Sequence, residues 1–446
     1  MQPHRILGII VMCTAALCAR ATTYYVSTTG SNSNPGTEAS PWRNVDYGVD
    51  QLAPGDKLYI RGGTYYETVT LWNKYGTSTA LIEVAEYPNE TAIIDGTGST
   101  ANSVFAIGGG STYINVRRLT IRNGPDTGIF VYGASYVDLL DNTVHGNGEF
   151  GICIRTPSAE SWGTTHHILV QGNYVYDNCR TNASRTASSW KQGVSAFRAN
   201  HVTITENDVY ENYGEGIDYI LSDNGTITKN EVYDNFSVNI YLDNAQSTKV
   251  DGNSISCGNT NYYRNGQAAG GVGVANETYT EYGQNVADGL TVSNNIVLRC
   301  HSGFTYWDGE YNNGMHNSVV AHNVFYNTGY ATVWIRGGSV HTNVLVANNV
   351  LYQKYNKPYA SSSGTTGVTY QYNNWYGGGD STTIITGAGD VTTDPKLVNV
   401  GGSADTDYQL TSTSPLINTG TNISAVTKDF WGTTRTNPPS IGIHEY

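Results

Sequence analysis

The chain has 446 residues, of which 51 are Gly and 34 are Tyr, and only 14% of its residues are charged. This composition excludes a coiled coil, which needs roughly half Ala, Glu, Lys, Leu and Arg, and it excludes a highly charged disordered chain. The formal net charge of −13, with 24 basic residues, argues against a nucleic-acid partner, because basic side chains supply most of the affinity for phosphate backbones. An acidic surface rich in Tyr, Asn and Gly suits sugars better.

Residues 1–21 are predicted to be a signal peptide. His4 and Arg5 precede the apolar run 6–17, and Ala19-Arg20-Ala21 matches an A-x-A-like cleavage site. The run is shorter than the ~20 apolar residues that a membrane span needs, and no later segment is long and apolar enough. We therefore expect a secreted protein, extracellular or periplasmic, without a membrane span, and we expect a monomer.

Residues 22–446 are predicted to form one elongated domain. It begins with a cap region at 22–75, in which residues 45–52 are expected to form a short helix before the turn at Pro54-Gly55-Asp56. A cap is needed because a repetitive β structure otherwise exposes its apolar core and its open strand edges.

The most informative feature is a degenerate repeat, V-x-x-N-x-V-Y-x-N, seen at 169–178, 203–212 and 226–235. Its units contain two or three short alternating β-runs and no helical period. The first Asn of the repeat recurs at positions 142, 173, 207, 230, 253, 295, 323 and 349. Stacked coils of roughly 22 residues indicate an all-β fold, a single-stranded parallel β-helix solenoid.

The repeated Asn is expected to be structural. Asn tolerates the left-handed turn conformation, and its amide hydrogen-bonds turn backbone, so a ladder of Asn side chains is the favoured interpretation. The Tyr residues that follow it in several coils are expected to pack with their hydroxyls in water.

The chain ends in a second cap region, 377–446, where the segments 394–399 and 408–418 are expected to be strands folded across the last coils. Four cysteines follow the signal peptide: Cys153, Cys179, Cys257 and Cys300. The chain has no CxxC spacing, which disfavours zinc, and one or two disulfides of open pairing are expected outside the cytoplasm.

Two stretches resemble a known group. The opening YYVSTTGSNSNPGTEASPW…APGDKLYIRGGTYYE and the closing DPKLVN…YQLTSTSPLINTGT are similar to the secreted right-handed parallel β-helix polysaccharide lyase superfamily. The resemblance is closest to family 9 pectate lyases and extends to alginate and chondroitin lyases. It implies a right-handed β-helix with capped ends and cleavage of an acidic, uronate-containing polysaccharide by β-elimination.

The resemblance also implies calcium. Family 9 pectate lyases bind Ca²⁺ through a D-D-G-F-D stretch, and the matching segment here is 214–224, with Glu215 and Asp218 on two acidic positions and Gly214 on a third. The catalytic Lys of that family would align near residues 239–241, where this chain has no Lys.

Aligning the strand after each turn Gly or Ser predicts a groove. Side chains alternate along a strand, so one offset should point inward and the next outward. The inward offset holds Val194, Ile217, Val238 and Val272, and the outward offset holds Ser195, Asp218, Asn239 and Gly273. With coils ~4.8 Å apart, Asp243, Glu277 and Asp308 should form an acidic ladder beside Tyr241 and Trp307.

Two mechanisms suit such a surface. In a β-elimination, Glu215, Asp218 and Asp243 would hold Ca²⁺, and Lys191, Arg198 or Tyr241 would be the base. In a glycoside hydrolysis, Asp243 would act with Glu277 or with Asp308, because carboxyl groups ~5 Å or ~6.5–9.5 Å apart are required.

Substrate binding is assigned to Trp190, Asn239, Trp307 and Asp308. The insertion at 156–192, which carries Trp190, is expected to wall the groove. A third hypothesis, ranked after the lyase and the hydrolase, is a non-catalytic glycan-binding or adhesin β-helix, because acidic residues at strand ends are often turn caps.

Overall fold

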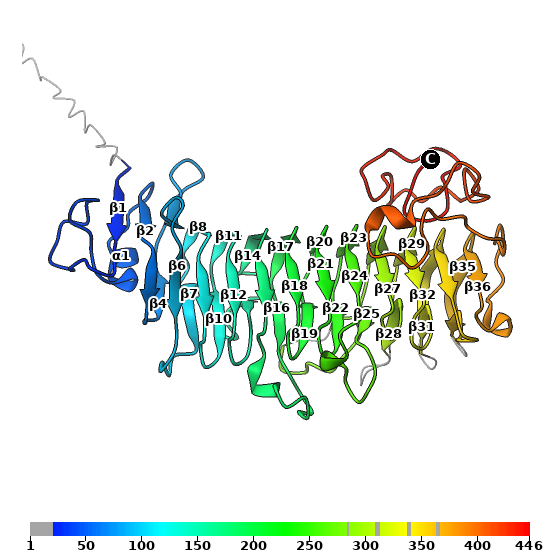
Figure 1. The fold of residues 1–446 in the computed structure, drawn as a ribbon, viewed down its shortest axis with the longest axis horizontal. Helices are drawn as coiled ribbons and strands as arrows, with labels where there is room; N and C mark the ends of the chain where they lie inside the picture. The colour runs from blue at the N-terminus through cyan, green and yellow to red at the C-terminus, as the bar shows by residue number, and fades with distance from the viewer. Residues whose placement is uncertain (1–20, 283–284, 308–312, 337–339, 363–365) are drawn as a thin grey trace, which may run out of the picture.

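Short β-runs separated by polar turns stack on the equivalent runs of the next coil throughout the chain. The computed structural model describes residues 21–282, 285–307, 313–336, 340–362 and 366–446. Within them, every strand pair of the solenoid is parallel, and the strands form three long sheets. Figure 1 shows the elongated stack. The predicted parallel β-helix is confirmed.

The three sheets are named after their first strands. The β1 sheet contains β1 (Thr23–Val26), β2 (Lys57–Ile60), β5 (Ile82–Glu86), β8 (Thr112–Arg117), β11 (Ser135–Leu140), β14 (His166–Gln171), β17 (Asn200–Thr205), β20 (Thr226–Thr228), β23 (Lys249–Asp251), β26 (Thr291–Ser293), β29 (Val319–Ala321), β32 (Val340–Ala347) and β35 (Thr366–Gln371). The β3 sheet contains β3 (Gly63–Tyr65), β6 (Ala92–Asp95), β9 (Thr120–Arg122), β12 (Thr143–His145), β15 (Tyr174–Tyr176), β18 (Asp208–Tyr210), β21 (Glu231–Tyr233), β24 (Ser254–Ser256), β27 (Ile296–Leu298), β30 (Val324–Tyr326), β33 (Val350–Gln353) and β36 (Asn374–Gly377). The β4 sheet contains β4 (Val69–Trp72), β7 (Ser103–Gly108), β10 (Thr127–Tyr132), β13 (Ile152–Arg155), β16 (Gln192–Phe197), β19 (Glu215–Ile220), β22 (Val238–Asp243), β25 (Gly270–Ala275), β28 (Phe304–Trp307), β31 (Val333–Ile335) and β34 (Ala360–Ser361).

The predicted short helix is present as α1 (Val45–Asp50). Val45 and Val49 lie one turn apart, so they share a face, and both are buried in the core at the first coils. Trp42 is buried beside them. The helix therefore covers the apolar interior at the N-terminal end.

Asparagine ladders lie at two of the turns. Asn207 donates to the side-chain oxygen of Asn230 at 2.9 Å, and Asn230 donates in the same way to Asn253 at 2.9 Å. Each amide also donates to a backbone carbonyl, as Asn230 does to Ile204 at 3.0 Å. The ladder runs from Asn142 to Asn373, which confirms the structural interpretation and adds one step to the predicted series.

Tyrosines stack along the outer face of the β3 sheet. The rings of Tyr176 and Tyr210 are 5.1 Å apart and those of Tyr210 and Tyr233 are 4.8 Å apart, with nearly parallel planes. All three side chains are half-buried. This agrees with the expectation of packing rings with accessible hydroxyls.

The C-terminal segment folds back along the side of the later coils (Figure 1). Leu410 and Ile441 are buried against Leu298 of β27 and Tyr326 of β30. The expected strands are not formed: the described residues of this segment contain the 3-10 turn η4 (Asp405–Tyr408) and isolated bridges. Frequent Gly, Pro and Ser residues in this segment favour turns over continuous ladders.

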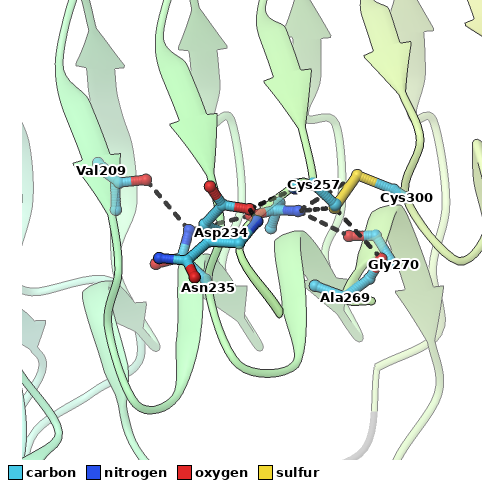
Figure 2. Close-up of a disulfide and its surroundings, with 10 residues drawn as sticks. Val209, Asp234, Asn235, Cys257, Ala269, Gly270 and Cys300 are labelled. Carbon is cyan, nitrogen blue, oxygen red and sulfur yellow. Dashed lines mark hydrogen bonds between the residues drawn. A yellow bond between two sulfur atoms is a disulfide. The ribbon is translucent and has the colours of Figure 1, made fainter. Parts of the chain in front are cut away.

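A disulfide joins Cys257 to Cys300, 43 residues apart, at the turns that lead toward the β4 sheet (Figure 2). Cys153 and Cys179 are free thiols and are buried. In the part of the chain that the structure describes, no helix has the length and apolar character needed to cross a membrane.

Candidate active site

A cleft of about 640 Å³ lies on the outer face of the β4 sheet. Its floor comes from β19, β22 and β25, and its walls come from segments that leave the solenoid before β16 and after β24 and β25. Asp218, Asp243 and Glu277 all line it. The structure thus brings together these three carboxyl groups, as expected of one trough, while their catalytic roles remain predictions. The predicted in-register ladder is wrong, because Asp243 pairs with Ala275 and Glu277 lies two residues beyond the end of β25.

The register of β22 differs from the predicted one by two residues. Ile217 pairs with Ile240 and Asp218 pairs with Tyr241, whereas the alignment had paired Ile217 with Val238. The turn before β22 carries two more residues than the turn-based alignment assumed. A shift of two residues keeps the same alternation of faces, but Val238, predicted to point inward, is the first residue of β22 and lines the cleft. Tyr241 replaces Asn239 beside Asp218.

The floor is closely packed at Gly273. Tyr241 pairs with Gly273 on the next coil, and Gly273 with Thr305. A Cβ at Gly273 would lie only 3.0 Å from Cδ2 of Tyr241. The absence of a side chain at Gly273 therefore lets the Tyr241 ring pack closely against β25.

Glu215 is held at the start of β19. Its Oε1 accepts a hydrogen bond from the indole Nε1 of Trp190 at 3.2 Å, and its Oε2 accepts one from Nε2 of Gln192 at 3.0 Å. Both donors come from the preceding coil. Because both carboxylate oxygens of Glu215 are already hydrogen-bonded, its orientation is set before any ligand arrives.

Asp243 and Glu277 are joined by crossed tyrosine contacts. Tyr241 donates to Oε1 of Glu277 at 2.8 Å, and Tyr279 donates to Oδ2 of Asp243. The backbone N–H of Glu277 also donates to Oδ1 of Asp243 at 3.3 Å. Each carboxyl group is thus positioned by a tyrosine that is close in sequence to the other one.

Asp218 is distinguished from the other carboxyl groups by its burial, its hydrogen bonding and its pKa. It is only 2% exposed, and its Oδ1 has no hydrogen-bond partner in the part of the chain that the structure describes. Burial, together with the neighbouring charges of Glu215, Asp243 and Glu277, raises its pKa well above 3.8. Burial also raises the pKa of Asp243 and of Glu215. This cluster therefore keeps a proton to a higher pH than isolated carboxyl groups do.

Aromatic rings line the two sides of the cleft. Trp190 forms one wall, with the guanidinium of Arg264 4.4 Å from its ring. Trp307 lies at the other side, 42% exposed, with the guanidinium of Arg336 4.0 Å from its ring. Exposed indoles beside polar groups are surfaces on which sugar rings bind.

Several predicted site residues lie elsewhere. Lys191 points toward Glu149, with 3.9 Å between Nζ and Oε2. Arg198 is buried and donates to the carbonyls of Pro157 at 3.3 Å and Glu160 at 3.1 Å. Neither residue is among those that line the cleft. Their side chains leave the strand at its ends, a direction that sequence alternation does not specify.

Asn239 is also outside the cleft. It is fully buried, accepts a hydrogen bond from Asn235 at 3.0 Å and donates to the carbonyl of Gly270 at 3.1 Å. It belongs to the second asparagine ladder, beside the disulfide whose surroundings Figure 2 shows. The substrate-binding assignment of Asn239 followed from the wrong register. Asp308 lies outside the described residues.

Three functional-looking residues were not predicted as site residues: Gln192, Arg264 and Tyr279. Gln192 ends the insertion at 156–192 that was expected to wall the groove. Tyr279 follows Glu277 by two positions, and this spacing is the signal that could have identified it. Arg264 lies in a long excursion after β24 and had no sequence signal.

The three predicted calcium ligands are not arranged as a calcium site. Among the described residues, no group of three or more His, Cys, Asp and Glu side chains is arranged to hold a metal ion. Both oxygens of Glu215 and of Asp243 already accept hydrogen bonds, so Asp218 alone of the three predicted ligands has an oxygen without a partner. Calcium prefers several available oxygen ligands, and the residues as arranged do not fit it.

Comparisons with known proteins support the fold. A family model described as "Pel9A-like, right handed beta helix region" matches residues 24–317. Pectate lyase PEL9 of Emericella nidulans is 40% identical over 73 residues, which cover 16% of this chain and 18% of that protein. Pectate lyase L of Paenibacillus polymyxa is 23% identical over 197 residues, covering 42% of this chain and 41% of that protein.

Among solved structures, the complex of XylC with xylose is similar in fold. Its TM-score is 0.62 at 12% identity, over 95% of this chain and 98% of that one. The alignments with the two pectate lyases span less than half of each lyase. The comparisons therefore establish the right-handed β-helix, and the chemistry must be argued from the cleft.

Proposed function

Since this chain belongs to the Pel9A-like right-handed β-helix family, we propose that it is a carbohydrate-active enzyme that hydrolyses glycosidic bonds of a polysaccharide. The observation that carries this proposal is Asp218, a buried carboxyl group with a free oxygen and a raised pKa in an acidic, aromatic cleft. Glycoside hydrolysis needs one carboxyl group that keeps its proton and a second that is ionised.

Asp218 is the general acid in this proposal. Burial and the surrounding carboxyl groups keep its proton on at a pH at which ordinary aspartates have lost theirs. Its Oδ1 is buried and has no hydrogen-bond partner among the described residues, and the floor of the cleft must open locally for this oxygen to meet a glycosidic oxygen of a bound sugar. Protonation of that oxygen would let the leaving sugar depart as an alcohol.

Glu277 is the second carboxyl group. The phenol of Tyr241 pairs in register with Asp218 and donates to Glu277, which places Glu277 across the Tyr241 ring from the acid. This hydrogen bond sets the orientation of the Glu277 carboxyl group. Glu277 would act on the anomeric carbon directly or through a water molecule.

The bases that the sequence predicted for a β-elimination do not suit proton abstraction in this cleft. Of the described residues that line the cleft, Arg264 is the single Lys or Arg, and its guanidinium stacks on Trp190. Tyr241, the remaining predicted base, has a pKa raised well above 10 by burial and by nearby carboxylates. A phenol with a raised pKa is a poor base near neutral pH.

Secretion belongs to the same proposal. The predicted signal peptide at 1–21 and the Cys257–Cys300 disulfide both support an oxidising location outside the cytoplasm, where disulfides persist. A polysaccharide substrate is consistent with such a location and with the exposed indole of Trp307.

The test is reducing-sugar release from xylan, pectate, alginate and chondroitin. We expect Asp218→Asn and Glu277→Gln each to lower kcat on the cleaved polymer by about 10²–10⁴-fold. Glu231→Gln, which changes an exposed carboxylate on the β3 sheet, is the matched control and should retain full activity. Full activity in Asp218→Asn would refute the assignment of the acid.

β-Elimination remains the second candidate, favoured by the similarity to two pectate lyases. It produces unsaturated ends that absorb in the ultraviolet, whereas hydrolysis does not. Product absorbance on pectate and alginate, measured with added Ca²⁺ and with a chelator, separates the two reactions. Rising absorbance that requires Ca²⁺ would replace the hydrolase proposal, and binding without any turnover would favour the adhesin hypothesis.

A further inference from the structure

A row of outward-facing side chains continues from the cleft toward the N-terminal end of the solenoid. Ile220, Asp243 and Trp307 line the cleft, and they belong to a row in which each residue pairs with its neighbour on the next coil. The strands that carry the row follow one another along the stack in Figure 1. In chain order, the row consists of Trp72, Gly108, Tyr132, Arg155, Phe197, Ile220, Asp243, Ala275 and Trp307.

The first five residues of this row are called here the outer track, and aromatic rings occupy every second position of it. Trp72, Tyr132 and Phe197 alternate with Gly108 and Arg155. All three rings are partly exposed. Because successive coils are ~4.8 Å apart, the rings recur about every 9.6 Å along the solenoid. A regular spacing of exposed rings suits a ligand that is itself a regular, extended chain.

Trp72 lies flat against the end of β7. A Cβ at Gly108 would overlap Cη2 of the indole, and a Cβ at Gly109 would overlap its Cδ1. The two glycines therefore make room for the whole ring, and one indole face rests on backbone while the residue stays partly exposed. A flat indole at the surface is the geometry on which a sugar ring stacks.

The next positions of the outer track add ring area and hydrogen-bond donors. The ring of Phe130, on the same face of β10, lies 5.1 Å from that of Tyr132. The guanidinium of Arg155 lies 4.8 Å from the Phe197 ring, and its Nη2 donates to the hydroxyl of Tyr282 at 3.4 Å. A guanidinium carries five N–H donors, so Arg155 can also donate to a ligand. Rings that alternate with donors match a sugar chain, whose ring faces are apolar and whose edges carry hydroxyls.

We propose that the outer track binds a distal part of the polysaccharide whose scissile bond lies in the cleft. This inference rests on the proposed glycan-cleaving function and adds a second binding region to it. The ligand is an extended 1,4-linked chain in which every second sugar faces the same way, because two sugars of such a chain match the ring spacing. Trp190 and Gln192 line the cleft on the coil before Asp218, so the cleft extends toward the outer track and one polymer can occupy both.

The first arm of the test measures binding by native affinity electrophoresis in gels that contain xylan, pectate, alginate or chondroitin. At least one polymer should retard the wild type, and Trp72→Ala and Tyr132→Ala should each lower the affinity for it by about 5-fold. Trp72→Phe keeps a ring and should lose less. Tyr174→Ala removes an exposed ring from the β3 sheet and is the matched control. No retardation of the wild type, or equal retardation of the folded variants, would overturn the outer track.

The second arm compares a long substrate with a short one. Trp72 lies six coils, or about 29 Å, from Asp243, so a tetrasaccharide in the cleft does not reach it. Trp72→Ala should raise KM for the polymer by about 5-fold and leave the cleavage of the tetrasaccharide unchanged. Equal loss on both substrates would overturn the outer track and leave the proposed function intact. Weaker retardation of the variants without cleavage of any polymer by the wild type would support the outer track and refute the proposed function.

The third arm uses the wild-type protein and therefore decides the question if Trp72→Ala does not fold. N-Bromosuccinimide oxidises accessible indoles, and peptide mapping measures the oxidation at each Trp. The retarding polymer should slow oxidation of Trp72 by about 5-fold. Trp431, 37% exposed in the C-terminal segment, is the control and should be oxidised at the same rate with and without polymer. Equal oxidation of Trp72 in both conditions would overturn the outer track.

Discussion

Tyr241 donates a hydrogen bond of 2.8 Å to Glu277 across 36 residues of sequence. Its backbone pairs with that of Asp218 on the preceding coil, so one phenol lies between the two carboxyl groups assigned to catalysis. Tyr279 makes the reciprocal contact with Asp243. The segment after β25 is thereby attached to the acid cluster at two points.

Removing the Tyr241 hydroxyl should impair catalysis without impairing binding. We expect Tyr241→Phe to lower kcat about 10-fold and to change KM by less than about 2-fold, because the ring remains and Glu277 loses a donor. Tyr210→Phe, in the outer tyrosine stack, is the control and should match wild type. An unchanged kcat in Tyr241→Phe, or a rise in KM that accounts for the whole loss of activity, would contradict a positioning role.

Much of the fold was predictable because its determinants are periodic. The asparagine spacing, alternating β-runs and apolar positions repeat coil after coil, and each repeat is a local signal for turn and strand. The convergence of Asp218, Asp243 and Glu277 followed from the same stacking. The predicted register of β22 was wrong, because the turn before β22 is longer by two residues than the alignment assumed. No local pattern in the sequence marks where these extra residues lie.

Asp218 should make the folded protein less stable as the pH rises. Below its ordinary pKa of 3.8, folded and unfolded chains both hold the proton. Between that value and the raised folded pKa, the unfolded chain loses the proton first, so the free energy of unfolding falls with increasing pH. Above the folded pKa the loss is complete and constant.

Asp218→Asn removes this penalty. Its Tm should equal that of wild type at about pH 3.5 and exceed it at pH 8, because the wild-type penalty develops only above the ordinary pKa of an aspartate. Differential scanning calorimetry across this range measures the gap. A gap that narrows with rising pH would show that the pKa of Asp218 is not raised.

The central asparagine ladder should be costly to interrupt. Asn230 accepts from Asn207 and donates to Asn253 and to the carbonyl of Ile204. Asn230→Ala leaves several buried groups without partners, at about 1–3 kcal/mol for each. We expect the free energy of unfolding to fall by at least about 2 kcal/mol in urea titration. Asn422→Ala, at an exposed position, should change it by less than about 0.5 kcal/mol.

The disulfide should stabilise the cleft wall. Cys257 and Cys300 are separated by 43 residues, and the segment between them carries Arg264, Glu277 and Tyr279. Closing a loop of this length stabilises a fold by about 4 kcal/mol in the chain-entropy account. Dithiothreitol should lower the Tm of the wild type and leave a Cys257→Ala, Cys300→Ala double variant unaffected. Equal responses to the reductant in both proteins would argue against this bond.

The cleft walls were harder to predict than the floor. Floor residues lie on strands, where alternation specifies direction, whereas Lys191 and Arg264 lie in excursions whose paths depend on long-range contacts. Lys191 was assigned to the groove and lies beside Glu149. Arg264 was not assigned and stacks on Trp190. The sequence shows how long the segments that leave the solenoid are, but it does not show over which face of the solenoid they run.

The folded-back C-terminal segment has a consequence for biogenesis. Leu298, Tyr326 and Val350 lie on the outside of the solenoid and are covered by Leu410, Ile441 and Ile443. During vectorial synthesis these coils form before their cover has left the ribosome. The apolar surface of these coils therefore stays exposed to water until the final residues emerge. We expect chaperones to bind a nascent chain that is stalled before Ile441.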